Sequence, residues 1–333
     1  MRDGQEPLVS VVTPVYNGES YIRACIESVL AQTYTKWDYT IVNNCSTDRT
    51  LEIAQEYVAK DSRIRIHNNK SFVRVMENYN IAMRLISAES KYCKVVAADD
   101  SLFRDCLERM VCVAESHPSV AIVGAYGLEG TRVQWHGLPY PSTVVPGREI
   151  CRSRLLGGRY VFGTPTSVLY LSNIVRSRTA FYNESNLHSD SEVCLEFLES
   201  HDFGFVHQVL TIQGEREDSL TSFSQNFQTY FSWILYELVK YGPKYLSNAE
   251  LQRRIREHLG DYYNYLGHQI YEHRGQEFWE FHRRKLADVG YPLSTLRLTV
   301  VAATYILDLL LNPKSMVERV VRRLRRILSG SQV

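Results

Sequence analysis

The sequence predicts an α/β protein with a doubly wound, mostly parallel sheet and a C-terminal helical extension. In the first 125 residues, short apolar runs alternate with segments of helical periodicity, which is typical of βαβ units. The apolar runs end in polar or turn-forming residues, as strands buried in a parallel sheet often do. Beyond residue 225 the pattern is almost wholly helical and rich in aromatic residues. We therefore expect a first domain at residues 1–225 and a helical region at 226–333.

The elements can be placed in order along the chain. Strands are expected at residues 8–13, 39–42, 64–66, 94–97 and 120–125, and helices at 19–32, 48–59, 73–88 and 102–116. Glycine and proline then recur up to residue 165, which predicts a loop-rich segment. A short strand at 167–171 and a helix at 190–200 complete the expected first domain.

The composition excludes several classes of protein. Of 333 residues, 44% are hydrophobic and 23% charged, which is ordinary for a globular protein. The 38 Lys and Arg residues against 37 Asp and Glu give a net charge of +1, which argues against a nucleic-acid binder. The seven cysteines form neither a CxxC pair nor a zinc-binding pattern, and this favours reduced thiols in a cytoplasmic protein. Because no secretory signal and no membrane-spanning apolar stretch is found, any membrane contact should be peripheral.

Polar motifs follow three of the predicted strands. The first strand ends in TPVYNGE at 13–19, the second in NNCSTD at 43–48, and the fourth in AADD at 97–100. Ligands of open α/β sheets bind outside the carboxyl ends of the strands, so we expect these motifs to share one edge. Polar groups of the first two motifs could hold a nucleoside, and the carboxylates of the third could hold a divalent cation.

In combination, PVYNGE, NNCSTDRT and AADD resemble the family-2 glycosyltransferases with the GT-A fold, over about residues 7–222. The resemblance implies an inverting glycosyltransferase that uses a nucleoside diphosphate sugar, often UDP-linked. The acceptor would be a hydroxyl group of a glycan or of a lipid-linked glycan. It also implies that Pro14, Tyr16 and Asn17 line the nucleotide pocket.

The same resemblance implies that Asn44 meets the base of the nucleotide. The family usually has two aspartates where this chain has Asn43 and Asn44. An amide oxygen can accept the imide N–H of uracil as a carboxylate does. On the residues alone, this motif could also be a polar turn that caps the next helix, with Asp48 as the capping residue.

The resemblance implies that Asp99 and Asp100 are metal ligands, because they match the end of the DxD-type motif of the family. Mg²⁺ or Mn²⁺ would be the cofactor, and through it Asp99 would also bind the nucleotide sugar. Ala97 stands where the family has its first aspartate, so diphosphate and water must complete the ligand set. The alternative is an aspartate pair that caps the helix expected from residue 102.

Two further matches concern the transfer itself. The segment HSDSE at 188–192 resembles the family segment that supplies the catalytic base, and Asp190 is the matching residue. An inverting transfer needs one carboxylate to accept the proton of the acceptor hydroxyl. Glu192 is a second candidate, and Asp190 could instead be a helix cap. Arg216 stands where the family often has His near the diphosphate, and its guanidinium could neutralise phosphate but not bind a metal ion.

The C-terminal sequence carries a second pattern. At helical spacing, the apolar residues of 314–328 occupy one arc and five arginines the opposite arc. This predicts a helix lying on an anionic membrane surface, such as the inner face of the cell membrane. The alternative is a helix packed on the protein with a solvated basic face.

Three rival functions stay open. Ala97 and Arg216 are compatible with a transferase that needs no metal ion. The departures at 43–44 and 97–98 are compatible with a non-catalytic protein or scaffold that binds nucleotide sugars. A structural protein that anchors to membranes is a weaker third.

Overall fold

Strand β1 (Val9–Val15) is central to a group of four parallel strands in the computed structural model, which describes residues 6–214, 224 and 226–311. The group has the order β3-β2-β1-β4, with β2 (Trp37–Asn43), β3 (Ile64–Asn68) and β4 (Tyr92–Val95). All seven residues of β1 are buried, because helices cover both faces of a parallel sheet and its strands can be apolar throughout.

The sheet continues beyond β4 through a short antiparallel strand. The order there is β4-β9-β6-β10-β5, and β6 and β10 run parallel. The bounds are β5 (Ser101–Leu102), β6 (Val120–Glu129), β9 (Val168–Leu171) and β10 (Asp202–Gln213), with β7 (Arg132–Gln134) and β8 (Val144–Val145) beside β6 and β10. The predicted fold class is therefore confirmed, and the antiparallel pairs each include one short strand.

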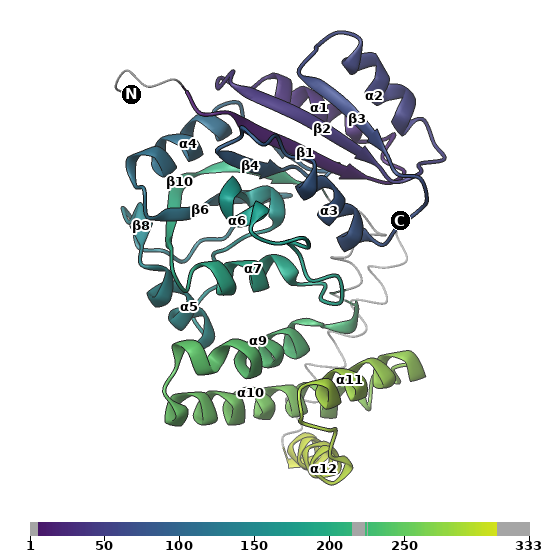
Figure 1. The fold of residues 1–333 in the computed structure, drawn as a ribbon. Helices are drawn as coiled ribbons and strands as arrows, with labels where there is room; N and C mark the ends of the chain where they lie inside the picture. Colours follow the sequence, from purple (N-terminus) through teal and green to yellow (C-terminus); the bar gives the residue numbers. More distant parts are fainter. Residues whose placement is uncertain (1–5, 215–223, 225, 312–333) are drawn as a thin grey trace. The chain divides into compact units, whose positions relative to one another are not determined.

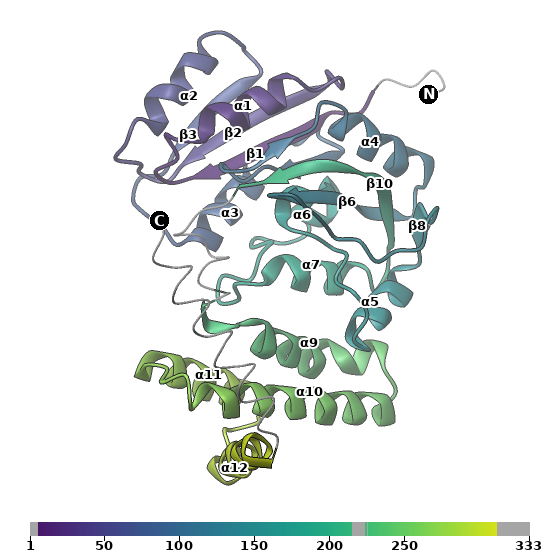
Figure 2. The same cartoon turned by 180° about the vertical axis from the view of Figure 1, so that it is seen from behind.

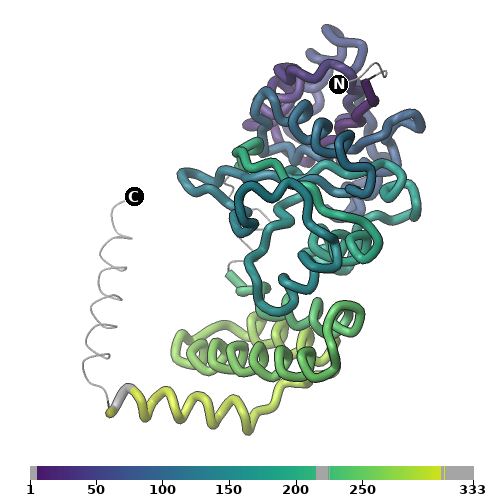
Figure 3. The backbone as a smooth tube through the Cα atoms, turned by 90° about the vertical axis from the view of Figure 1, so that its left-hand side faces the viewer, coloured from purple at the N-terminus to yellow at the C-terminus, as the bar shows by residue number. Residues whose placement is uncertain are grey.

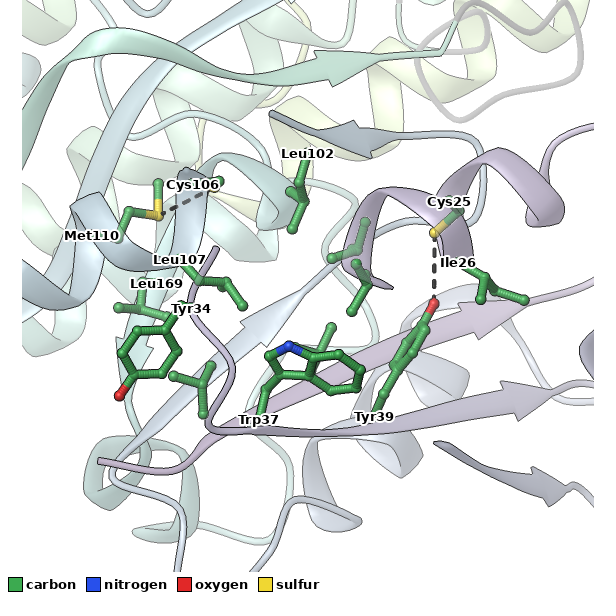
Figure 4. Close-up of a cluster of buried hydrophobic side chains, with 14 of the residues drawn as sticks. Cys25, Ile26, Tyr34, Trp37, Tyr39, Leu102, Cys106, Leu107, Met110 and Leu169 are labelled. Atoms are coloured by element: carbon green, nitrogen blue, oxygen red, sulfur yellow. Dashed lines mark hydrogen bonds between the residues drawn. The ribbon is translucent and has the colours of Figure 1, made fainter. Parts of the chain in front are cut away.

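Helices cover the two faces of this sheet. One face packs against α1 (Ile22–Leu30), α2 (Thr50–Val58) and α4 (Cys106–Ser116), whose buried residues share one apolar core with the strands. In that core Tyr39 of β2 lies beside Cys25 of α1, with the phenol oxygen 3.7 Å from the sulfur (Figure 4). Helices α3 (Val75–Arg84) and α6 (Ser172–Arg176) lie on the opposite face (Figures 1 and 2).

The expectation of a loop-rich segment at 127–165 was wrong in part, because helix α5 (Gly147–Leu155) lies within it. Proline and glycine mark the start of this helix rather than a loop. Pro146 is the N-cap residue, and a Cβ atom on Gly147 would lie only 1.9 Å from the carbonyl oxygen of His201. Glycine is therefore required here because two backbones approach closely, and not because the segment is a flexible loop. Strand β10 has no counterpart among the predicted strands.

The chain divides into two compact units, residues 1–223 with 244–246, and residues 224–243 with 247–333. The second unit contains α10 (Asn248–Gln269), α11 (Gln276–Asp288), α12 (Thr295–Leu311) and most of α9 (Tyr230–Tyr245). Helix α12 packs against α10 (Figure 3). Among the described residues, no helix is long and apolar enough to cross a membrane. The basic helix predicted at 314–328 lies outside the described residues.

Aromatic residues form much of the core of the helical unit. The ring of Tyr262 stacks on Phe231 at 5.2 Å between centroids, and its hydroxyl is hydrogen-bonded to Nδ1 of His282 at 2.6 Å. His282 is fully buried. Burial disfavours the charged imidazolium and lowers the pKa of His282 to about 4.

This buried histidine predicts a loss of stability in acid. Below its ordinary pKa of about 6.5 the imidazole binds a proton in the unfolded chain, whereas in the folded chain it does so only near pH 4. The free energy of unfolding should therefore fall by about 2–3 kcal/mol between pH 7 and pH 4 on account of this group. Urea unfolding of His282→Phe should show a weaker pH dependence. The exposed His268 provides the control, and equal pH profiles for His282→Phe and His268→Gln would contradict the assignment.

Candidate active site

The register of the parallel strands brings the first two polar motifs together. Val15 at the end of β1 is paired with Asn43 at the end of β2, and Asn43 with Asn68 at the end of β3. The N–H of Asn44 also donates to the carbonyl of Val15 at 2.9 Å. The motifs that follow β1 and β2 therefore meet at one edge of the sheet, as the sequence predicts.

Asn17 joins the two motifs directly. Its backbone has a φ of +46°, and its N–H donates to the hydroxyl of Ser46 at 3.0 Å. Its side-chain oxygen accepts the N–H of Thr47 at 2.8 Å. Asp48 accepts the N–H of Thr50, the first residue of α2, at 3.0 Å, but the N-cap residue is Arg49, so the expectation that Asp48 caps the helix was wrong. Asn17 thus holds the second loop against the first.

The residues predicted to line the nucleotide pocket differ in exposure. Pro14 and Asn44 are buried, whereas 43% of Tyr16 is exposed. The ring of Tyr16 makes an edge-to-face contact with Phe72, with centroids 4.8 Å apart, and Phe72 is 60% exposed. This pair forms an apolar aromatic surface beside polar loops, which suits the flat face of a nucleobase. Phe72 was not singled out from the sequence, since it follows β3 without a recognisable motif.

The amide of Asn44 is engaged within the protein. Its oxygen accepts the N–H of Val73 at 3.0 Å and the side-chain N–H of Asn69 at 2.9 Å, and its nitrogen donates to the carbonyl of Val73 at 2.9 Å. Asn44 therefore fixes the backbone of Val73, which directly follows Phe72. Its predicted contact with the base is a separate role, which stays a prediction.

The third motif places two carboxylates in different environments. Asp99 is partly exposed, whereas Asp100 is buried and accepts the N–H of Gly214 at 3.0 Å. Burial and the negative charge of Asp99 raise the pKa of Asp100 to about 7. The alternative of a helix cap is wrong, because α4 begins only at Cys106 and its N-cap residue is Asp105.

The carboxylates of Asp99 and Asp100 fit a divalent cation whose remaining ligands come from a bound phosphate and from water. Burial and the neighbouring charge raise the pKa of Asp100, and a positive charge bound between the two carboxylates would stabilise their ionised form. Ala97 contributes no ligand, and within the described ranges no three His, Cys, Asp or Glu side chains gather as a complete set. Asp99 and Asp100 would thus hold Mg²⁺ or Mn²⁺ only together with phosphate and water oxygens.

A buried lysine supports the carboxylates from within the sheet. Lys94 on β4 is fully buried, and its ammonium donates to the carbonyl oxygens of Thr166 and Val168. Burial lowers its pKa. The hydroxyl of Thr166 accepts the N–H of Ala97 at 3.0 Å and is hydrogen-bonded to Asp100. Lys94 therefore fixes the turn that holds both ends of the AADD motif. In the sequence, the only sign of this role is a charged residue inside an apolar strand.

We expect Lys94→Met to lower the free energy of unfolding by about 2–3 kcal/mol, because two buried carbonyl groups lose their donor. Thermal unfolding measures this effect. Lys91→Met is the matched control, since Lys91 is half exposed and its ion pair with Glu115 lies at the surface. Such a pair contributes about 0–1 kcal/mol. Equal melting temperatures for the two variants would contradict the supporting role of Lys94.

Asp190 lies in the first turn of α7 (Ser189–Phe197) and is partly exposed. The N-cap residue is His188, so Asp190 is the second residue of the helix rather than its cap. A carboxylate there is stabilised by the helix dipole. Glu192, the second candidate for the base, is 3% exposed and accepts side-chain N–H groups from Asn183 at 3.0 Å and Asn186 at 2.8 Å. Glu192 therefore fixes the preceding loop.

Tyr79 on α3 connects the two sets of carboxylates. Burial raises its pKa well above the ordinary value, and the negative charges of Asp99, Asp100 and Asp190 raise it further. The negative charges of all three carboxylates therefore act on one hydroxyl group, although Asp99 and Asp190 are far apart in the sequence. Tyr79 has no motif around it and was missed.

Arg216 lies outside the described residues.

The sheet, with polar loops after β1 and β2 and carboxylates after β4, has the GT-A fold of glycosyltransferases that use nucleotide sugars. Residues 10–179, about half of the chain, match the model of glycosyl transferase family 2. The chain belongs to this family.

Curated relatives match part of the chain. EpsE of Bacillus subtilis is 32% identical over 158 residues, which cover 45% of this chain and 56% of EpsE. TuaG of Bacillus subtilis, whose name assigns it to teichuronic acid biosynthesis, is 37% identical over 110 residues, covering 32% of this chain and 41% of TuaG. The chain therefore spans about half the length of these relatives.

Solved structures share the fold over most of the chain. Residues 1–349 of S. aureus TarS in complex with UDP-GlcNAc align with a TM-score of 0.62 and 17% identity, over 92% of this chain and 87% of TarS 1–349. The mannosyltransferase PcManGT from Pyrobaculum calidifontis, in complex with GDP-Man and Mn²⁺, aligns with a TM-score of 0.57 and 14% identity, over 92% of this chain and 81% of PcManGT.

Proposed function

We propose that the chain is an inverting glycosyltransferase that moves a sugar from a UDP-linked donor to a hydroxyl group of a glycan or lipid-linked glycan. The observation that carries the proposal is the parallel register of β2, β1 and β4, whose carboxyl ends lead into the polar loops at 13–19 and 43–48 and into the carboxylates of Asp99 and Asp100. The electrostatic effect of Asp99, Asp100 and Asp190 on the pKa of Tyr79 supports a candidate metal site and a candidate base in the same region. The UDP-GlcNAc complex of TarS supports the choice of donor, and the name of TuaG supports a polymeric acceptor.

Each part of the site has a role in this reaction. Tyr16, Phe72 and the loops around Pro14, Asn17 and Asn44 hold the nucleoside. The carboxylate of Asp190 accepts the proton of the acceptor hydroxyl as that oxygen attacks the anomeric carbon. The bond from the anomeric carbon to the diphosphate oxygen breaks, and the diphosphate leaves with the electron pair.

Two groups would neutralise the leaving diphosphate. A divalent cation held by Asp99 and Asp100 supplies positive charge to it. Arg216 adds a second positive charge. In this proposal, residues 1–225 form the catalytic domain, residues 226–333 form the helical region, and the protein is cytoplasmic. Residues 314–328 contact the anionic inner face of the cell membrane. Co-sedimentation with anionic vesicles, compared between the full chain and a chain ending at residue 313, tests this contact.

Hydrolysis of a donor panel tests the proposed function. The purified chain is incubated with UDP-glucose, UDP-galactose, UDP-GlcNAc and GDP-mannose, and the released nucleotide is measured with Mn²⁺ and with EDTA. We expect release from at least one UDP-sugar, and loss of release in EDTA. Release that EDTA does not diminish would support the metal-independent alternative that Ala97 suggests.

A second candidate function is binding of a nucleotide sugar without transfer. The internal hydrogen bonds of Asn44 and the missing carboxylate at Ala97 favour it. Tight binding of UDP-sugars with no release of nucleotide, to water or to any acceptor, would support this function and exclude the first.

A further inference from the structure

A cluster of polar side chains gathers over Gly127 on β6. A Cβ atom at Gly127 would lie 2.8 Å from Nε1 of Trp135, 3.2 Å from the hydroxyl of Thr211 and 3.2 Å from the amide nitrogen of Gln213. Glycine is needed there because any side chain would collide with the indole. The close packing brings an indole N–H, a hydroxyl and an amide to one point on the sheet.

Two of these groups are unsatisfied. Nε1 of Trp135 and the hydroxyl of Thr211 are buried and have no hydrogen-bond partner among the described residues. An unpaired buried polar group lowers stability, and buried polar groups are nearly always paired in folded proteins. Within the described part of the chain, the amide of Gln213 makes long contacts, at 3.5 Å to Thr164 and 3.4 Å to Ser167.

The backbone at Trp135 is also strained. Its φ is +64°, a conformation that a bulky residue rarely adopts. Strain of this kind concentrates at sites that bind ligands. The unsatisfied N–H and the strained backbone are independent observations at the same residue, and together they indicate a group preorganised for a partner that the free protein does not supply.

The cluster is tied to the carboxylates through β10. Thr211 and Gln213 lie on this strand, and the next residue, Gly214, donates its N–H to Asp100. Ser167 belongs to the same turn as Thr166, which is hydrogen-bonded to Asp100. A donor whose diphosphate met a cation held by Asp99 and Asp100, as the proposed function has it, would thus have this cluster of hydrogen-bonding groups beside its other end.

We propose that Trp135, Thr211 and Gln213 form the subsite for the sugar of the donor. The inference rests on the proposed function and names the residues that choose the sugar. The ring of Trp135 is partly exposed, and its rotation opens the N–H and the hydroxyl of Thr211 to the ligand. An indole offers an apolar face to the C–H groups of a pyranose, while its N–H, the hydroxyl and the amide bond the sugar hydroxyls.

Calorimetric titration of UDP and of UDP-glucose, UDP-galactose and UDP-GlcNAc separates this subsite from the rest of the site. For Thr211→Val we expect the affinity for the best-bound UDP-sugar to fall about tenfold while the affinity for UDP is unchanged. The melting temperature of the free variant should not fall, because the lost hydroxyl has no partner in the folded chain. A hydroxyl with a purely structural role would show the opposite pattern, a lower melting temperature and unchanged affinities.

A second pair of variants keeps the test independent of position 211. Trp135→Phe retains a ring but removes the N–H, and should lower sugar affinity in the same way. Trp233→Phe is the control, because the N–H of Trp233 donates to Glu237 within the helical unit. Unchanged UDP-sugar affinity in both Thr211→Val and Trp135→Phe would overturn the subsite while the wild-type chain still binds donor. Failure of the wild-type chain to bind any UDP-sugar would overturn the proposed function and the subsite together.

Discussion

Asp190→Asn is expected to lower the turnover number by about 10²–10⁴-fold, the range in which a general base contributes to catalysis. Asparagine has nearly the same shape as aspartate but cannot accept the proton of the acceptor hydroxyl. Asp190 is partly exposed in the first turn of α7, so the fold should persist. Donor affinity, measured by titration, should be nearly unchanged, because the proposed role of Asp190 concerns the acceptor.

Glu192→Gln provides the matched control in the same helix turn. Its carboxylate is buried and accepts two amide N–H groups, so this variant should lower the melting temperature and spare turnover in the folded protein. Full turnover of Asp190→Asn with every accepted donor would rule out Asp190 as the base. Loss of turnover in a fully folded Glu192→Gln variant would transfer the assignment to Glu192.

The second large effect is expected at Asp99. We expect Asp99→Asn to lower kcat/KM by about 10²–10³-fold and to raise the concentration of Mn²⁺ needed for half-maximal activity. Asp99 is the more exposed of the two carboxylates and would lose the charge that holds the cation and, through it, the diphosphate. Initial rates over a range of Mn²⁺ concentrations measure both effects.

Asp105→Asn is the control for this second prediction. Asp105 belongs to the same connection into α4 and pairs with Arg109 at 3.1 Å on the surface, so its loss should change neither rate nor metal dependence. Activity of Asp99→Asn that equals the wild type at every Mn²⁺ concentration would remove Asp99 from the site. If EDTA also leaves the wild-type rate intact, the metal-independent alternative stands.

The sequence predicted the first half of the sheet because local signals there agree with the final packing. Strands β1, β2 and β4 are mostly apolar and largely buried, and the three polar motifs follow their ends. The helix at α5 was missed because its start, Pro146 and Gly147, reads locally as a turn. Its need for glycine arises from the backbone at His201, more than fifty residues away, and no local pattern records such a contact.

The same limit applies to the site. The motifs around Asp99 and Asp190 were recognisable in the sequence, but Tyr79, Lys94 and Trp135 act through groups brought close only by the fold. Lys94 could have been noticed as a charge within an apolar strand. Trp135 carries no signal at all, since its strain and its unpaired N–H exist only once β6 and β10 are side by side.

The hydrogen bonds between Asn44 and the backbone of Val73 have a consequence for exchanging parts between relatives. The amide oxygen accepts the N–H of Val73 and the amide nitrogen donates to the carbonyl of the same residue, and an aspartate, which lacks the donor, cannot replace it without losing one of these bonds. If residues 69–73 are replaced by those of a relative with two aspartates at 43–44, we therefore expect the new loop to adopt its own conformation only when the residue at position 44 is replaced as well. The loop that presents Phe72 and the side chain of Asn44 therefore have to be exchanged together, although 28 positions separate Asn44 from Phe72 in the chain.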